Sequence, residues 1–91
     1  DEAMQIGLVL RKFSTKNEMI DDAFKTLKQI AENSSFAVAI SKKVMNEGID
    51  LTINEGLQLE KRQFSAIFSS EDMREGTKAF LEKRKPLFKG K

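Results

Sequence analysis

Five carboxylates in the second half of the chain are the side chains best placed to act as acids or bases. They are Glu55, Glu60, Asp72, Glu75 and Glu82. Acid–base catalysis on a carbonyl compound needs two carboxylates and an oxyanion hole that converge on one carbon. The segments around these residues contain no Gly-rich turn that presents paired backbone amides. We therefore assign the five carboxylates to helix caps, helix N-termini and surface charges, and expect no catalytic residue among them.

Two residue types that carry much enzyme chemistry are missing. The chain has no histidine, which removes the commonest general base, the Ser-His-Asp triad and most zinc sites. It has no cysteine, so it offers neither a thiol nucleophile nor a disulfide. The DxD, HExxH, Walker and dinucleotide-binding motifs are also absent.

Length and charge further limit the domain organisation and the classes of partner. Ninety-one residues allow one domain at most, with a modest core. Sixteen basic and fourteen acidic residues are mixed along most of the chain and give a net charge of +2, which does not favour general nucleic-acid binding. No apolar run approaches the roughly 18 residues of a membrane span, and the acidic start is unlike a signal peptide. We expect a soluble protein that is not secreted.

The C-terminal tail is an exception to this even distribution. It is basic at Lys83, Arg84, Lys85, Lys89 and Lys91, and Glu82 is the only acidic residue within it. Cations at a helix C-terminus complement the negative end of the helix macrodipole. The same charges can alternatively hold a phosphate.

The beginning of the chain predicts a helical turn and a strand. Residues 1–6 fit a helical turn that stops at Gly7, a residue suited to the left-handed C-terminal cap. Leu8-Val9-Leu10 then fits a short buried strand. Such a strand needs a partner that this sequence does not contain, so we expect the missing sheet to lie upstream.

Apolar residues at helical spacing predict four helices in the rest of the chain. We expect these helices to be centred near Thr26, Ile40, Gln58 and Lys78. Four caps are predicted to begin them: Asn17, the segment Asn33-Ser34-Ser35, the capping box Thr52/Glu55, and Ser69 followed by Asp72. Pro86 is expected to end the last helix.

Two glycines, Gly56 and Gly76, fall inside the predicted third and fourth of these helices. Glycine within a helix costs about 0.5–1 kcal/mol relative to alanine. We expect another helix backbone to approach closely at both positions, because only glycine permits that approach.

The last twenty residues, from Asp72 to Lys91, resemble the C-terminal helix of the crotonase superfamily, the enoyl-CoA hydratases and isomerases. Members of this family often end in a D-x-x-E-G-x-x-A-F-x-E-K-R-K-P-x-F-x-G pattern. The A-x-x-I-G-L-V sequence from Ala3 to Val9 resembles the segment that closes the family's catalytic domain. The chain departs from the family at residues 10–13, and Phe36 stands where a proline is common.

The resemblance implies an all-α fold, namely the C-terminal helical (trimerisation or cap) domain of a crotonase-like protein. About four helices would follow a short N-terminal strand stub. Residues 1–13 would be the end of the catalytic core, made of a helical turn and the strand, and residues 14–91 the helical domain. The family's two catalytic glutamates and two oxyanion-hole amides would lie upstream, so we expect this fragment to be inactive alone.

The resemblance also suggests three binding residues. Phe64 and Phe80 would wall the acyl-CoA cleft, and Lys83 would bind the phosphate of the CoA adenosine. The resemblance implies that acyl-CoA is the substrate of the parent enzyme, and it implies neither a cofactor nor a metal. Helical spacing alone fits ordinary core positions for the two phenylalanines and a solvated helix end for Lys83.

By this resemblance the parent enzyme would hydrate trans-2-enoyl-CoA to 3-hydroxyacyl-CoA in fatty-acid oxidation. It would work as a trimer or a dimer of trimers, in the bacterial cytoplasm or the mitochondrial matrix. Isomerases and other acyl-CoA enzymes of the family share this tail, so the reaction type stays open. A further alternative is a free-standing helical module that binds a partner protein through its apolar faces.

Overall fold

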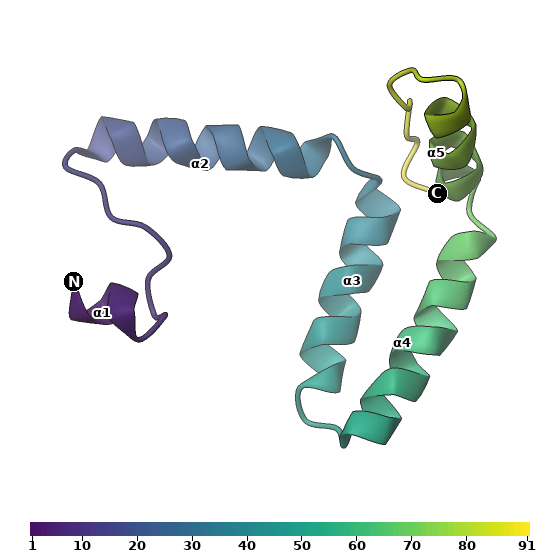
Figure 1. Cartoon of the computed structure of the whole chain (residues 1–91), viewed down its shortest axis with the longest axis horizontal. Helices are drawn as coiled ribbons and strands as arrows, with labels where there is room; N and C mark the ends of the chain where they lie inside the picture. Colours follow the sequence, from purple (N-terminus) through teal and green to yellow (C-terminus); the bar gives the residue numbers. More distant parts are fainter. The chain divides into compact units, whose positions relative to one another are not determined.

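The computed structural model describes residues 1–91 and contains five helices and no strand (Figure 1). The helices are α1 (Glu2–Gln5), α2 (Lys16–Ala31), α3 (Ser35–Gly48), α4 (Ile53–Phe68) and α5 (Glu71–Leu81). The predicted all-α fold is confirmed, with the four long helices near their expected centres. The chain divides into two compact units, residues 1–30 and 31–91. No helix is both long enough and apolar enough to cross a membrane.

The first unit begins with the predicted helical turn. Helix α1 ends in a Schellman motif, in which the amide of Gly7 bonds to the Met4 carbonyl at 3.1 Å and the amide of Leu8 to the Ala3 carbonyl at 2.9 Å. Gly7 has the left-handed φ of 74° that this motif requires. The strand expected at residues 8–10 is wrong, since these residues are irregular and exposed. A strand needs a hydrogen-bonded partner strand, and the chain supplies none.

Helix α2 begins at Lys16, and its cap, Thr15, lies two residues before the predicted cap. The Glu18 amide bonds to Thr15 Oγ1 at 3.2 Å, and the Thr15 amide bonds back to Glu18 Oε2 at 3.3 Å. The predicted cap, Asn17, lies inside the first turn of the helix. The reciprocal Thr15/Glu18 pair is the more favourable cap because it satisfies two otherwise unpaired amides, whereas a lone Asn cap satisfies one.

In the second unit, α3 and α4 form an antiparallel helical hairpin (Figure 1). The side chain of Ser34 caps α3 by accepting the amide of Ala37 at 3.3 Å. Thr52 and Glu55 form the capping box of α4, with bonds of 3.3 Å and 3.0 Å. Both predicted caps are confirmed, and the capping box accounts for Glu55, whose pKa is lowered by hydrogen bonds from the side chain and the amide of Thr52.

Both predicted boundaries of α5 are wrong. Ser70, rather than Ser69, caps the helix by accepting the Met73 amide at 3.0 Å, while the Ser69 hydroxyl donates back to the Ala66 carbonyl of α4. The helix ends at Leu81, well before Pro86. It ends there because the backbone turns into the left-handed region at Lys83, which leaves Pro86 in the tail.

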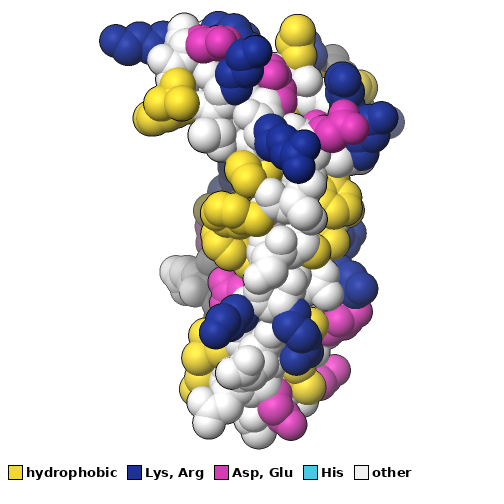
Figure 2. Space-filling model, turned by 90° about the vertical axis from the view of Figure 1, so that its right-hand side faces the viewer, with side chains coloured by type: hydrophobic (Ala, Val, Ile, Leu, Met, Phe, Trp, Pro, Cys, Tyr) yellow, Lys and Arg dark blue, Asp and Glu magenta, His cyan; other side chains and the backbone are white.

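The chain buries little apolar surface. Leu59 and Ala79, which are 6% and 1% exposed, are the only buried hydrophobic residues. The exposed ones include Phe24, Leu27, Phe64, Phe68 and Phe80. Figure 2 shows hydrophobic patches interspersed with charged side chains on the α4 and α5 side. Such patches are what a ligand or a protein surface covers.

Candidate functional site

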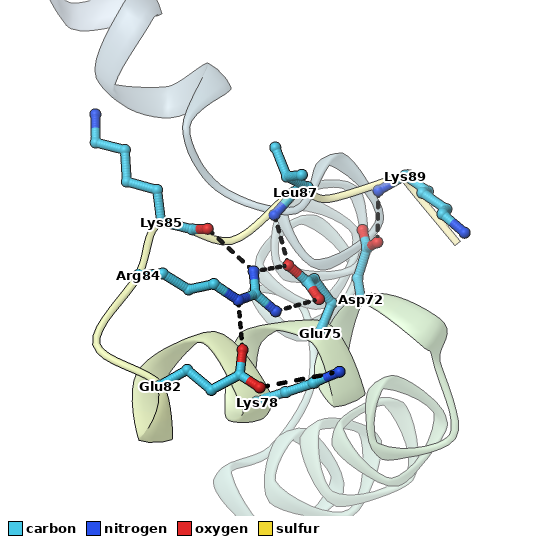
Figure 3. A network of polar contacts seen from close by, with 8 residues as sticks. All are labelled: Asp72, Glu75, Lys78, Glu82, Arg84, Lys85, Leu87 and Lys89. Carbon is cyan, nitrogen blue, oxygen red and sulfur yellow. Dashed lines mark hydrogen bonds and ion pairs between the residues drawn. The ribbon is translucent and has the colours of Figure 1, made fainter.

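Residues 82–91 fold back along α5, and we call this segment the C-terminal clasp. Glu75 on α5 holds it through the guanidinium of Arg84, with Arg84 Nη1 2.6 Å from Oε1 and Nη2 3.0 Å from Oε2 (Figure 3). The amide of Leu87 adds a bond of 2.8 Å to Glu75 Oε1. One carboxylate therefore fixes two points of the clasp.

These bonds favour the ionised forms of both side chains. The hydrogen bonds from Arg84 and from the Leu87 amide lower the pKa of Glu75 from 4.5 to about 2. The same pairing with Glu75, together with Glu82, raises the pKa of Arg84. Glu75 is consequently ionised at neutral pH and has no proton to donate to a substrate.

Asp72 fastens the far end of the clasp. This residue is 2% exposed, and its carboxylate accepts the hydroxyl of Ser34 at 2.6 Å and the amides of Lys89 and Gly90 at 2.7 Å and 2.9 Å. Its own amide donates to the Lys91 carbonyl at 2.9 Å. Burial acts to raise the pKa of Asp72, but these hydrogen bonds outweigh it and lower that pKa. Asp72 thus joins the start of α3, the start of α5 and the clasp.

Two glycines give the clasp room. A Cβ on Gly76 would lie 3.4 Å from the Phe88 ring, so the expected close approach exists, although the neighbour is a side chain of the clasp and not a helix backbone. Gly90 has a φ of 78°, and its Cβ would lie 2.6 Å from Ser35 Oγ. Gly56 has no atom within 4 Å of such a Cβ, so the prediction of a close approach there is wrong.

The clasp explains part of the sequence pattern that carries the family resemblance. Asp72, Glu75, Gly76, Arg84 and Gly90 all make its contacts. The sequence pattern predicted the two acids to stabilise a helix N-terminus, and their role in the clasp was missed. Their spacing to Arg84 and to the C-terminal glycine was the available signal.

Lys83 stands at the junction of α5 and the clasp. Its φ of 53° is the chain's only positive φ outside glycine. A second Schellman motif holds it, with the Lys83 amide 3.2 Å from the Phe80 carbonyl and the Arg84 amide 3.0 Å from the Ala79 carbonyl. Lys83 therefore takes the position where a helix usually has glycine.

The other cations of the tail have acidic partners, most of which lie outside the tail. Arg84 pairs with Glu75 and Glu82, and Lys85 lies 4.0 Å from Glu32. Lys89 and Lys91 lie 3.7 Å and 3.9 Å from the carboxylate of Glu71. Lys83 alone among them forms no ion pair, which leaves its ammonium available to an outside anion.

The two predicted phenylalanines are exposed, unlike ordinary core residues. Phe64 is 59% exposed and meets Phe68 edge to face, with ring centroids 4.9 Å apart. Phe80 is 83% exposed, three residues before Lys83 at the end of α5. The two aromatic side chains are thus free to meet a ligand or a second protein surface.

Phe64 belongs to an open groove of about 230 Å³ between α3 and α4. The apolar lining also includes Ile40, Val44, Met45 and Ile67. Glu60 is its one carboxylate, so the groove offers no acid–base pair. Phe80 and Lys83 do not line it, so the groove does not unite the three predicted site residues. Their role in acyl-CoA binding stays a prediction.

Comparisons with known proteins identify the family. The family model described as enoyl-CoA hydratase/isomerase matches residues 1–91. A probable mitochondrial enoyl-CoA hydratase from Dictyostelium discoideum is 38% identical over 90 residues, which cover 99% of this chain and 32% of that protein. A mitochondrial enoyl-CoA hydratase from Pongo abelii is 38% identical over 88 residues, covering 97% of this chain and 30% of that protein.

A solved structure agrees with these relatives. The crystal structure of enoyl-CoA hydratase from Bacillus anthracis superposes with a TM-score of 0.92 at 33% identity, covering 99% of this chain and 34% of that one. The chain thus spans about a third of the length of the relatives it matches. Its fold matches the helical C-terminal domain of crotonase-like proteins. The chain belongs to the enoyl-CoA hydratase/isomerase family.

Proposed function

We propose that this chain forms the C-terminal helical part of an enoyl-CoA hydratase, which adds water across the trans-2 double bond of an enoyl-CoA to give a 3-hydroxyacyl-CoA. The names of the relatives support this reaction. The residues described here supply no acid–base pair, so the chain's part is to bind substrate and to assemble the enzyme. Relatives about three times as long have room for a separate catalytic domain.

In this proposal Lys83 binds the phosphate of the CoA adenosine. The observation that carries the assignment is an unpaired ammonium, in a tail whose other cations are paired, three residues after the exposed ring of Phe80. A lysine neutralises a phosphate as a point charge. Phe80, and Phe64 on α4, would provide apolar walls for the pantetheine or the acyl chain.

The exposed apolar surfaces also support assembly. Phe24 and Leu27 on α2 and Phe64 on α4 are exposed, and contacts in a trimer or a dimer of trimers would cover them. We propose a role in fatty-acid oxidation, in the mitochondrial matrix or the bacterial cytoplasm; relatives named as mitochondrial, and one from a bacterium, fit these two locations. The same surfaces fit the second candidate, a free-standing helical interaction module.

Hydratase assays on the polypeptide that carries this chain and on residues 1–91 alone would test the proposal. The conjugated enoyl thioester absorbs in the ultraviolet, and hydration removes this absorbance. We expect the longer polypeptide to be active and residues 1–91 to be inactive. A start codon directly before the codon of Asp1 would favour the interaction module and overturn the hydratase proposal.

Lys83→Ala tests the phosphate contact. A partly exposed charge-assisted contact of about 1–2 kcal/mol predicts a roughly five- to thirtyfold higher KM for acyl-CoA, with turnover largely kept. The matching acyl-pantetheine lacks the adenosine phosphate and should be indifferent to the change. An equal loss of turnover on both substrates would make Lys83 structural and would refute the phosphate assignment.

A further inference from the structure

The two neighbours of Lys83 are joined to each other. Arg84 Nε lies 2.6 Å from Glu82 Oε2, so an ion pair links the residues immediately before and after Lys83. This link acts together with the Schellman bonds from the Lys83 and Arg84 amides. The backbone of Lys83 is therefore held on both sides.

The link is itself anchored to α5. Arg84 uses its two terminal nitrogens for Glu75, and Nη1 also reaches the Lys85 carbonyl at 3.2 Å (Figure 3). The Leu87 amide on the same carboxylate fixes the chain three residues further on. Each nitrogen of the guanidinium donates within the clasp or to Glu75, so Arg84 is held in place by the clasp.

The backbone conformation of Lys83 is disfavoured, and the anchoring of the clasp holds it in place. A residue with a Cβ is disfavoured at a φ of 53°, and such residues persist where the surroundings impose the conformation, often at functional sites. A flexible lysine loses freedom when it binds an anion, and fixing its backbone beforehand reduces that loss.

We propose that Glu75 and Arg84 are positioning residues for Lys83, whose ammonium they present to the CoA phosphate by holding its backbone left-handed. This inference rests on the proposed function, because it takes the phosphate as the ligand of Lys83. Glu75 then supports phosphate binding although it carries a negative charge. Positioning and plain electrostatics therefore predict opposite effects for its removal.

The experiment uses Glu75→Gln in the active enzyme and compares KM for acyl-CoA with KM for the matching acyl-pantetheine. Loss of positioning should raise the ratio of the two KM values roughly threefold to tenfold. A purely electrostatic role predicts a lower ratio, because removing an anion favours phosphate binding. General loss of folded enzyme affects both substrates alike and leaves the ratio unchanged. A lower or unchanged ratio overturns the positioning proposal.

Glu71→Gln is the matched control. It removes the same charge from the same helix, but Glu71 pairs with Lys89 and Lys91 at the other end of the clasp. We expect it not to raise the ratio. A rise as large as that of Glu75→Gln would mean that general loosening of the clasp, and not the Glu75–Arg84 pair, is responsible, and would overturn the proposal. Glu82→Gln, which removes the link across Lys83 together with the weaker pair to Lys78, should raise the ratio as Glu75→Gln does, and no rise would count against the proposal.

Lys83→Gly separates phosphate binding by the ammonium from positioning of the backbone. Glycine keeps the left-handed backbone and removes the ammonium, so this variant should raise the KM ratio if Lys83 binds the phosphate. Adding Glu75→Gln to it should then change the ratio no further. If Lys83→Gly leaves the ratio unchanged, the phosphate assignment fails and the positioning proposal fails with it. If Lys83→Gly raises the ratio and Glu75→Gln does not, only positioning fails.

Discussion

Glu75 and Arg84, nine residues apart in sequence, meet through two side-by-side hydrogen bonds of 2.6 Å and 3.0 Å (Figure 3). This fork-to-fork geometry fixes direction as well as distance, because both groups are planar. A lysine in place of Arg84 would keep the charge but lose the second bond. The pair therefore specifies the path of the chain after α5 and, with it, the place of Lys83.

Gly90→Ala should destabilise the chain. Alanine would have to adopt a φ of 78°, and its Cβ would lie 2.6 Å from Ser35 Oγ. We expect a loss of about 1–3 kcal/mol in the free energy of unfolding, measured by chemical denaturation. Ser35→Ala should recover part of this loss, because it removes the clashing oxygen and leaves the backbone strain. A Gly90→Ala chain as stable as the parent would show that the clasp does not dock there.

Gly56→Ala provides the contrasting control. A Cβ at this position in α4 meets no atom within 4 Å. Alanine should therefore stabilise the helix by about 0.5–1 kcal/mol, the usual gain over glycine. Destabilisation in the isolated chain would contradict the open space seen around Gly56.

Acid should release the clasp at Glu75. The pKa of this carboxyl falls from 4.5 to about 2 on folding, so the ionised group stabilises the folded chain fully above about pH 5. This stabilisation is lost as the pH falls towards 2 and the carboxyl becomes protonated. The Leu87 amide, which donates to Glu75, should report the titration through its proton chemical shift, with a midpoint near 2.

Glu75→Gln should abolish that titration at Leu87 and flatten the acid limb of the stability curve. Asp72 acts in the same direction, since its pKa is also lowered, so the variant should keep part of the acid dependence. A Leu87 amide that titrates unchanged in Glu75→Gln would assign the effect to another group.

Residues 1–91 alone should self-associate. The exposed side chains of Phe24, Leu27, Phe64 and Phe80 leave apolar surface on both compact units. Pairing such surfaces buries them at about 25 cal/mol per Å², which favours association as concentration rises. Sedimentation velocity should show a concentration-dependent increase in mass. A compact monomer at millimolar concentration would refute this prediction.

Local sequence patterns predicted the features that interactions between residues close in sequence determine, namely helices and their caps. The four long helices follow from apolar spacing, and the caps at Ser34 and Thr52 follow from side chains that reach amides three residues away. The errors at Asn17 and Ser69 arose because neighbouring residues compete for the same amides. Thr15 (with Glu18) and Ser70 make the capping hydrogen bonds. Residue type alone does not predict which of several neighbouring polar residues will cap a helix.

The clasp was beyond such reasoning because its contacts are long-range. Asp72 meets Gly90 eighteen residues away and Ser34 thirty-eight residues away, and no periodicity connects these positions. The end of α5 was missed for a related reason. Pro86 is a strong helix breaker, yet the helix stops earlier, where bonds from Arg84 stabilise a left-handed lysine that intrinsic preference disfavours.

Lys83→Gly should separate stability from binding. Glycine tolerates a φ of 53° without the Cβ clash. The free energy of unfolding of the variant should therefore be about 1 kcal/mol higher than that of the parent chain. The same change removes the ammonium that we assign to the CoA phosphate, so KM for acyl-CoA should rise while KM for acyl-pantetheine stays the same. Lys83→Ala is the comparison, because it removes the same ammonium but keeps the Cβ and its strain.

Thermal unfolding and the two KM values, measured on the same preparations, check both halves of this prediction. If the strain at Lys83 is retained for function, replacing this residue with glycine should stabilise the chain and weaken substrate binding. If Lys83→Gly is less stable than Lys83→Ala, the left-handed backbone is not the source of strain. If it is more stable and binds acyl-CoA as the parent does, the lysine is retained for some reason other than the phosphate.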